Sequence, residues 1–196
     1  MQTRPSPPSV TRVKVMQLEA AGVGRYRLVA NLTDTSLNGD YGRQPEPDAV
    51  SRMVIHDFVV EGELLGPDLV ITRLDVRAST HPYRQCPAII PSCQALVGRS
   101  LAKEWRRAVL DTLGATAGCT HMTTLLLGLA EARTMAFFLQ MNDLVAYSNE
   151  TRADGRWTAT GLAVAPTIAD ACHVLTSSGS VIRQAQAGNA KGNDAS

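Results

Sequence analysis

The stretch at residues 52–79, RMVIHDFVVEGELLGPDLVITRLDVRAS, decides the fold class of this 196-residue chain. It holds two segments rich in Val and Ile, separated by a turn that contains Gly66, Pro67 and Asp68. Two such segments around a turn of this composition are typical of a β-hairpin. The stretch therefore predicts two antiparallel strands, at residues 52–64 and 68–79.

The alternation of residues in the second strand predicts how the hairpin meets its surroundings. Apolar side chains fall on one face and charged ones on the other, with Val70, Leu74 and Val76 against Arg73, Asp75 and Arg77. In an antiparallel sheet this pattern indicates one face packed on a core and one face in water.

Upstream of the hairpin, residues 11–19 (TRVKVMQLE) and 25–34 (RYRLVANLTD) alternate in the same way and predict two further strands. The segment at residues 35–51 is dense in Gly, Pro, Asn and Asp. A loop this long is uncommon in a compact domain and is often functional. We expect it to fold over a pocket.

Downstream of the hairpin the pattern turns helical. Residues 91–100 predict a short helix that begins near Pro91, and residues 100–114 predict a longer helix that ends at Gly114 as a C-cap. The longer helix has an apolar stripe made by Leu101, Trp105, Ala108, Val109 and Thr112. Residues 121–141 are apolar on almost every side, which predicts a mostly buried helix. Burial within the chain and burial at a homodimer interface account for it equally well.

The remaining segments complete an α+β fold, in which an antiparallel meander of about four strands precedes helices packed on one face. Residues 157–165 predict a late strand and residues 166–175 a short helix. We expect a mobile arm at residues 1–10, a single domain at residues 11–175 and a flexible tail at residues 176–196.

Composition excludes several classes of partner. The net charge is +1 and the basic residues are scattered, which argues against a nucleic-acid-binding surface. No run approaches the ~20 apolar residues that span a bilayer, and we expect neither a secretory signal nor a membrane partner. The four cysteines form no CxxC pair, which is typical of reduced thiols in a cytoplasmic protein.

The run Gly118-Cys119-Thr120-His121 lies where a loop enters the apolar helix. We expect Thr120 to be the N-cap, with Cys119 before it and His121 in the first turn. Free amide groups and the helix dipole favour a thiolate, a neutral imidazole and a bound anion at such a position. The run therefore offers a nucleophile or base beside a cluster of donors. Alternatively, Cys119 fills a small space and His121 bonds to a neighbouring carbonyl.

His56 lies inside the third strand, with Val54, Phe58 and Val60 on its own face. Because an unpaired buried polar group costs about 1–3 kcal/mol, His56 needs a partner. It is either a satisfied core residue or an acid or base that points into a cavity. Asp57 falls on the opposite face and cannot share these surroundings.

The connector at residues 79–87, STHPYRQCP, brings His81, Tyr83 and Cys86 to the end of a strand, where binding sites are common. It could instead be a connector stiffened by proline. Asp34 is expected to form a turn at the end of its strand, or to orient a substrate if the site lies close to it.

A metal site is the next alternative. Zinc binds the atom types that His56, His81, Cys86, Cys119 and His121 carry, but no pair of them has a spacing typical of zinc ligands. Such a site would need ligands from three separate segments. We therefore rank a metal-free site above a divalent-metal site.

Several of these segments resemble a bacterial family of unknown function, DUF2889. The similarity extends over roughly residues 8 to 138, and its elements are residues 32–35 (LTDT), the strand with His56, and residues 68–79, 81–87, 96–114 and 114–130. The resemblance implies a cytoplasmic protein encoded beside enzymes that break down aromatic or acyl compounds. It also groups His56, Cys86, Cys119 and His121 as a set.

We therefore expect a cofactor-independent enzyme of small-molecule catabolism, a lyase or hydrolase with an aromatic substrate. The chain has no phosphate-binding glycine loop, dinucleotide fingerprint or haem motif. The expected catalytic residues are His56 or His121 as proton acceptor and Cys119 as nucleophile. The expected substrate contacts come from Asp34, His81, Tyr83, Cys86 and Thr120. The alternative is a non-catalytic accessory protein that binds a ligand or a metal.

Overall fold

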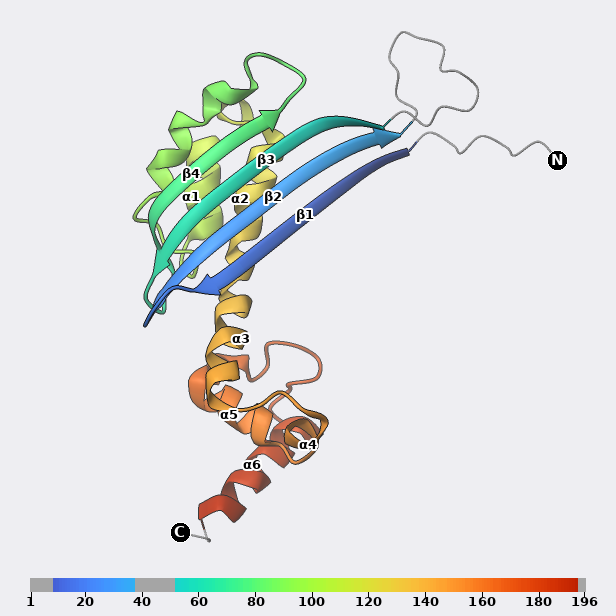
Figure 1. Cartoon of the computed structure of the whole chain (residues 1–196). Coiled ribbons are helices and arrows are strands. Elements are labelled where there is room, and N and C mark those ends of the chain that lie inside the picture. The colour runs from blue at the N-terminus through green and yellow to red at the C-terminus, as the bar shows by residue number, and fades with distance from the viewer. Residues whose placement is uncertain (1–8, 38–51, 194–196) are drawn as a thin grey trace, which may run out of the picture. The chain divides into compact units, whose positions relative to one another are not determined.

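The computed structural model describes residues 9–37 and 52–193, and it contains one four-stranded antiparallel sheet. The strands lie in chain order as a meander (Figure 1): β1 (Ser9–Ala20), β2 (Arg25–Leu37), β3 (Arg52–Leu65) and β4 (Val70–Thr80). Helices follow the sheet in the sequence. The α+β fold class and all four predicted strands are confirmed.

The predicted hairpin is β3 and β4, and its register contains one irregularity that the alternation does not reveal. Leu64 pairs with Ile71 and Glu63 with Arg73, so Thr72 is an extra residue at a β-bulge. Because of this shift, Ile71 is buried at 1% exposure, whereas Val70 is only partly buried. Leu74 and Val76 are buried as predicted.

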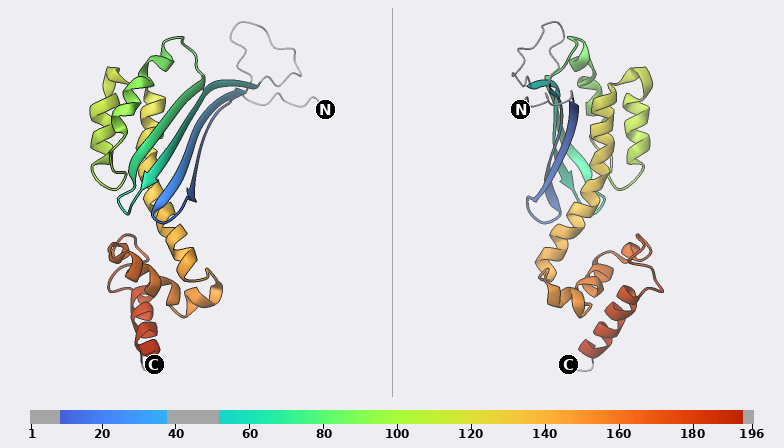
Figure 2. Two further views of the ribbon diagram at one scale, coloured as in Figure 1. Left: turned by 60° about the vertical axis from the view of Figure 1, so that its left-hand side comes forward. Right: turned by 90° about the vertical axis from the view of Figure 1, so that its right-hand side faces the viewer.

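Two helices lie on one side of the sheet, α1 (Trp105–Leu113) and α2 (Thr120–Gly128), as the right-hand view of Figure 2 shows. Trp105 joins them, because its indole nitrogen donates to the carbonyl of Leu126 at 2.8 Å. Two short 3₁₀ helices, Cys86–Ile89 and Pro91–Leu96, connect β4 to α1. The buried residues of this region include Leu28, Leu32, Phe58, Val60, Leu64, Leu96, Leu101, Val109, Leu113 and Leu126.

The helix predicted at residues 100–114 is shorter than expected. It begins at Trp105, so Leu101 is buried ahead of the helix and does not belong to its stripe. Gly114 does cap the C-terminus, in an extended conformation. A Cβ at Gly114 would lie 2.3 Å from the carbonyl oxygen of Leu110, which explains glycine at this position.

The apolar segment at residues 121–141 forms α2, a 3₁₀ turn at Leu129–Glu131, and α3 (Ala132–Leu144). The prediction that it is mostly buried is wrong, since 33% of its most apolar 18-residue window is buried. By length and composition alone, Thr120–Leu144 is one helix that could cross a membrane, with a mean hydropathy of 1.3. The core helix of a globular protein passes the same test, and Met122, Leu125 and Leu126 are indeed core residues.

The chain divides into two compact units, residues 1–133 and 134–196. The sequence alone predicts a single domain at residues 11–175. The second unit contains α4 (Asn149–Ala153), α5 (Arg156–Val164), a 3₁₀ turn at Pro166–Ile168, and α6 (Ser180–Asn193). The strand predicted at residues 157–165 is therefore wrong. α6 occupies most of the segment expected to be a flexible tail.

Helices α5 and α6 pack closely at Gly155 in the second unit. A Cβ at Gly155 would lie 2.9 Å from the carbonyl oxygen of Gln184, and the φ angle of Gly155 is +85°. Only glycine satisfies both the close approach and the positive φ without strain. The apparent strand signal at residues 157–165 comes from small residues, Thr158, Ala159 and Gly161, that are buried in the second unit. A Cβ at Gly161 would lie 3.0 Å from Ile168 and 3.2 Å from Phe137.

Candidate functional site

Asp34 and His56 lie opposite each other on β2 and β3, on the face that packs against the helices. The register shifts between Asp34 and Thr35, which leaves Ile55 as an extra residue in β3. Four polar residues at this bulge are buried: Asp34, Thr35, Ser36 and His56 have exposures of 4–8%. We call these four residues the polar end of the sheet.

Asp34 is held by two strands. Its partner on β1 is Arg12, whose Nε lies 2.7 Å from Oδ1 and whose Nη2 lies 2.7 Å from Oδ2. His56 Nδ1 lies 2.9 Å from Oδ2. The Arg12 guanidinium holds the pKa of the Asp34 carboxyl below its usual value, mainly through its hydrogen bonds. Asp34 is therefore an aspartate, and the nitrogen that faces it on His56 is the protonated one.

The loop between α1 and α2 carries Cys119 and His121 to this carboxylate. Gly114 and Gly118 allow the chain to turn back tightly between the two helices. A Cβ at Gly118 would lie 2.1 Å from the carbonyl oxygen of Leu113. That same carbonyl accepts a hydrogen bond from Thr123 Oγ1 at 3.1 Å. The start of α2 is thus fixed against the end of α1.

His121 stacks on His56. The ring centroids are 3.7 Å apart with an interplanar angle of 29°, and His121 Nε2 lies 3.7 Å from Asp34 Oδ2. Burial lowers the pKa of His121, and electrostatic interactions with His56 and Arg12 lower it further, against the opposing effect of Asp34. A neutral His121 is therefore favoured, as expected, although burial and not the helix dipole is its first cause. With its side chain 27% exposed, His121 is the solvent-facing member of the pair.

Cys119 completes the group of predicted catalytic residues. Its Sγ lies 3.8 Å from His121 Nδ1, within the range of a weak sulfur hydrogen bond. Cys119, and not Thr120, is the N-cap of α2, and its side chain makes no capping bond. Thr120 is the first residue of the helix and is exposed, so its predicted role as N-cap is wrong.

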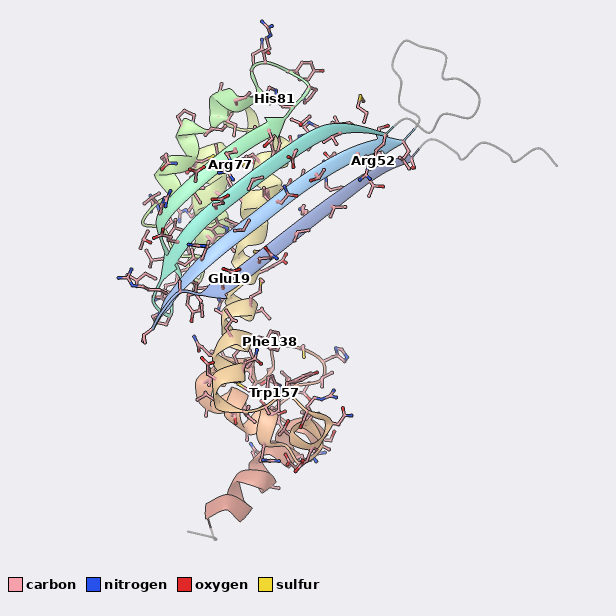
Figure 3. The ribbon with its side chains drawn as sticks, in the orientation of Figure 1. Glu19, Arg52, Arg77, His81, Phe138 and Trp157 are labelled. Atoms are coloured by element: carbon pink, nitrogen blue, oxygen red, sulfur yellow. The ribbon has the colours of Figure 1, made fainter. Side chains whose placement is uncertain are left out.

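The connector after β4 stays apart from this cluster. His81 Nδ1 bonds to the carbonyl of Tyr83 at 2.9 Å, and Tyr83 is 70% exposed. Figure 3 labels His81 in the loop beyond the end of β4. Cys86 opens the first 3₁₀ helix and is partly buried. Among the described residues, no hydrogen bond, ion pair or ring contact joins His81, Tyr83, Cys86 or the Thr120 side chain to the cluster.

Two further predictions concern neighbours of the site. Asp57 lies on the outer face, as predicted, where its Oδ1 accepts from Asn31 Nδ2 at 3.0 Å. The loop expected to fold over a pocket lies outside the described residues from position 38 to 51. Sequence reasoning missed Arg12, and the only signal for it is the register that pairs Arg12 with Asp34.

The cluster can support two kinds of chemistry. The first is proton transfer, because it places two imidazoles and a thiol around one buried carboxylate. The second is metal binding, since one ligand atom each from Asp34, His56 and His121 can be chosen with all three within 4.8 Å of one another. Cys93 is not a candidate nucleophile, because burial raises the pKa of its thiol to about 11.

Comparison with known proteins supplies the family. The model of a family described as "Protein of unknown function (DUF2889)" matches residues 10–135, close to two thirds of the chain, and every residue of the cluster lies in this range. The chain therefore belongs to the DUF2889 family. Searches of the curated proteins and of the solved structures returned no match.

Proposed function

We propose that this member of the DUF2889 family is a cytoplasmic, cofactor-independent enzyme, a lyase or hydrolase that acts on a small aromatic compound. The observation that carries the proposal is the hydrogen bond between His56 Nδ1 and Asp34 Oδ2, with His121 stacked on the same imidazole. The aromatic substrate follows from the catabolic gene sets that the family resemblance implies.

His56 is the proposed general base. An ionised aspartate only accepts hydrogen bonds, so the Asp34 contact keeps the proton on Nδ1. The lone pair of the neutral ring is then on Nε2, the nitrogen that faces away from Asp34. A carboxylate that fixes the tautomer and orientation of a histidine is a recurring arrangement in proton-transfer and acyl-transfer enzymes. General-base catalysis by such a residue contributes about 10²–10⁴-fold in rate.

His121 and Cys119 are proposed as the second acid–base group and the nucleophile. The 3.8 Å contact places the thiol where His121 Nδ1 can accept its proton. Cys119 precedes the first turn of α2, where backbone amides are free to stabilise a developing oxyanion. Hydrolysis would use the thiol and these amides, whereas elimination would use the two imidazoles alone.

Arg12 is proposed as a positioning residue. Its two hydrogen bonds hold both oxygens of Asp34, and they keep the carboxylate ionised beside the imidazoles. Without Arg12, the carboxylate would be free to rotate away from His56. Arg12 itself touches no reacting atom in this scheme.

The test combines ligand binding with turnover. Small aromatic carboxylates, esters and hydroxy acids are screened for a rise in melting temperature, and each hit is assayed for hydrolysis or elimination. We expect His56→Gln to lower turnover at least about a hundredfold, whereas His173→Gln, which changes an exposed histidine of the second unit, leaves it unchanged. Full turnover by a folded His56→Gln protein would refute the proposal.

The thiol is tested separately. We expect iodoacetamide to alkylate Cys119 in the native protein, and more slowly in His121→Gln, since the neighbouring imidazole no longer takes the thiol proton. A Cys172→Ser background removes the exposed competing thiol. Cys119 that reacts only after unfolding would remove the nucleophile from the mechanism and leave His56.

A non-catalytic ligand-binding module is the second candidate. It is favoured by the pairing of the buried polar atoms, because every fully buried side-chain nitrogen and oxygen among the described residues has a hydrogen-bond partner. The same screen separates the two functions. Ligands that raise the melting temperature through His56 and His121, with no chemical change in any of them, would indicate the module.

A further inference from the structure

We propose that Asp34, His56 and His121 form a binding site for one divalent first-row metal ion of the zinc class, with Oδ2, Nδ1 and Nε2 as ligands. This inference goes beyond the acid–base proposal and stands without it. It starts from the mutual distances of these atoms, with Oδ2 2.9 Å from His56 Nδ1 and 3.7 Å from His121 Nε2.

The distances suit a tetrahedral ion. Zinc bonds to nitrogen and oxygen are about 2.0–2.2 Å long, which places neighbouring ligand atoms in a tetrahedron about 3.4 Å apart. The two separations from Oδ2 lie on either side of this value. Binding of the ion requires a shift of about half an ångström in each, and the two rings, which stack with an interplanar angle of 29°, must turn so that both nitrogen lone pairs point at the ion. Three protein ligands leave a fourth position for water or a substrate atom, the pattern of catalytic rather than structural zinc sites.

The lone pairs of Asp34 Oδ2 allow a metal ion to take the place of a proton. Oδ2 accepts one hydrogen bond from Arg12 Nη2 and one from the Nδ1 proton of His56. The ion takes the place of that proton, which passes to solvent while Nε2 takes one up, so His56 stays a neutral imidazole and changes only its tautomer. Arg12 remains in place and orients the carboxylate. Its positive charge repels the ion, so the bonds from two imidazoles and one carboxylate to the ion must outweigh this repulsion.

Cys119 is assigned a positioning role in this site. A histidine that binds metal through one nitrogen usually donates a hydrogen bond from the other, which fixes the ring. His121 Nδ1 faces Cys119 Sγ at 3.8 Å, while Nε2 faces Asp34. Because the two nitrogens lie on opposite edges of the ring, the thiol orients His121 and does not bind the ion.

Metal binding and the proposed proton transfer exclude each other. An imidazole that coordinates through Nδ1 carries its proton on Nε2, so the metal-loaded form lacks the base described above. A divalent ion is therefore expected to inhibit turnover of the metal-free protein. This opposition makes the two proposals separable.

The experiment titrates the chelator-treated full chain, in a Cys172→Ser background, with Zn²⁺ by calorimetry and with Co²⁺ by visible absorption. We expect one ion per chain and the intense d–d bands of four-coordinate cobalt. His56→Gln and His121→Gln should each weaken binding more than about 100-fold, the upper range for loss of an outer partner. Cys119→Ser should weaken it about 10–100-fold, and His173→Gln should not change it.

X-ray absorption of the zinc-loaded wild type provides a measurement that needs no variant. We expect imidazole nitrogen and carboxylate oxygen at about 2.0–2.2 Å and no sulfur at about 2.3 Å. Sulfur in the shell, absence of stoichiometric binding, or unchanged affinity in both histidine variants would overturn the site. Turnover that requires the metal would support the site and end the acid–base proposal. Turnover that depends on His56 in a protein that binds no metal would support the acid–base proposal and refute the metal site.

Discussion

The inward face of strands β2 and β3 has two ends that are equally buried and chemically opposite. At one end lie Leu28, Val60 and Leu64, with exposures of 0–2%. At the other end Asp34 and His56 have exposures of 4% and 8%. The same two strands and the same layer of helices thus build an aliphatic core and, a few residues further, a charged cluster.

The contrast favours a role other than stability for the polar end. Burial of aliphatic surface contributes about 25 cal/mol per Å². A buried ion pair is often no more stable than apolar residues of the same size, because desolvation offsets the attraction. Residues that are buried and charged without a stabilising role are candidates for chemistry. The comparison therefore makes predictions for each end.

The largest effect is expected at the aliphatic end. Leu32, which is fully buried two residues before Asp34, is replaced by alanine. The lost burial and the cavity should lower the free energy of unfolding by about 2–5 kcal/mol, measured by urea denaturation. Val15→Ala is the control, since Val15 is 49% exposed on the same sheet and should cost less than about 0.5 kcal/mol. A cost below 1 kcal/mol for Leu32→Ala would remove the aliphatic core from the comparison.

Asp34→Asn should cost less, about 1–3 kcal/mol, because it weakens the acceptor shared by Arg12 and His56. The sharper test replaces the three hydrogen-bonded residues together, with Arg12→Met, Asp34→Leu and His56→Leu. This triple variant should be at least as stable as Asp34→Asn, since none of these three is left unpaired and the His121 side chain, 27% exposed, can bond to water. A triple variant several kcal/mol less stable than Asp34→Asn would show that the polar end stabilises the fold.

Gly118→Ala tests how the second segment is delivered to the polar end. The added Cβ must move away from the carbonyl oxygen of Leu113, which lies 2.1 Å from its ideal position. Overpacking of this kind costs about 1–3 kcal/mol, and we expect the displaced His121 to lose its stacking on His56. Histidine ring signals in NMR spectra report the stacking.

Gly128→Ala, at the last residue of α2, is the matched control. A Cβ there meets nothing within 4 Å, so the change should stabilise α2 by about 0.5–1 kcal/mol and leave the histidine signals unchanged. Equal effects of the two substitutions would mean that the tight loop does not position His121.

The two ends also differ in how far the sequence predicts them. Alternation identified the hairpin and the burial of Leu74 and Val76, because apolar periodicity is a local signal. It could not show the bulges at Thr72 and Ile55, which depend on how two strands pair. The loop at Gly118 was recognised as a candidate site, although its actual N-cap is Cys119.

Arg12 and the second unit show why the rest could not be predicted. Arg12 looks like an ordinary strand residue until the register places it beside Asp34, 22 positions away. Asp34 itself was expected to form a turn, because nothing local shows that it is buried and paired. Residues 157–165 have strand-like composition, but they form a helix whose buried small residues pack against other segments of the second unit. In each case a long-range contact overrides or supplies the signal.

The smallest effect is expected on the outer face of the sheet, where ion pairs join neighbouring strands in water. Arg77, labelled in Figure 3, pairs with Glu61 there, and Arg73 Nη1 lies 3.5 Å from Glu63 Oε1 with side chains 69% and 54% exposed. Arg73→Ala should change the free energy of unfolding by less than about 0.5 kcal/mol, because solvent screens the pair. Arg12→Ala removes the same residue type from its pair with the polar end. It should cost about 1–3 kcal/mol, because Asp34 is only 6% exposed even though the Arg12 side chain is 41% exposed. Equal costs for the two arginines would mean that burial of Asp34 adds nothing to its pairing. The pair between Arg12 and Asp34 would then contribute no more to stability than an exposed ion pair on the outer face.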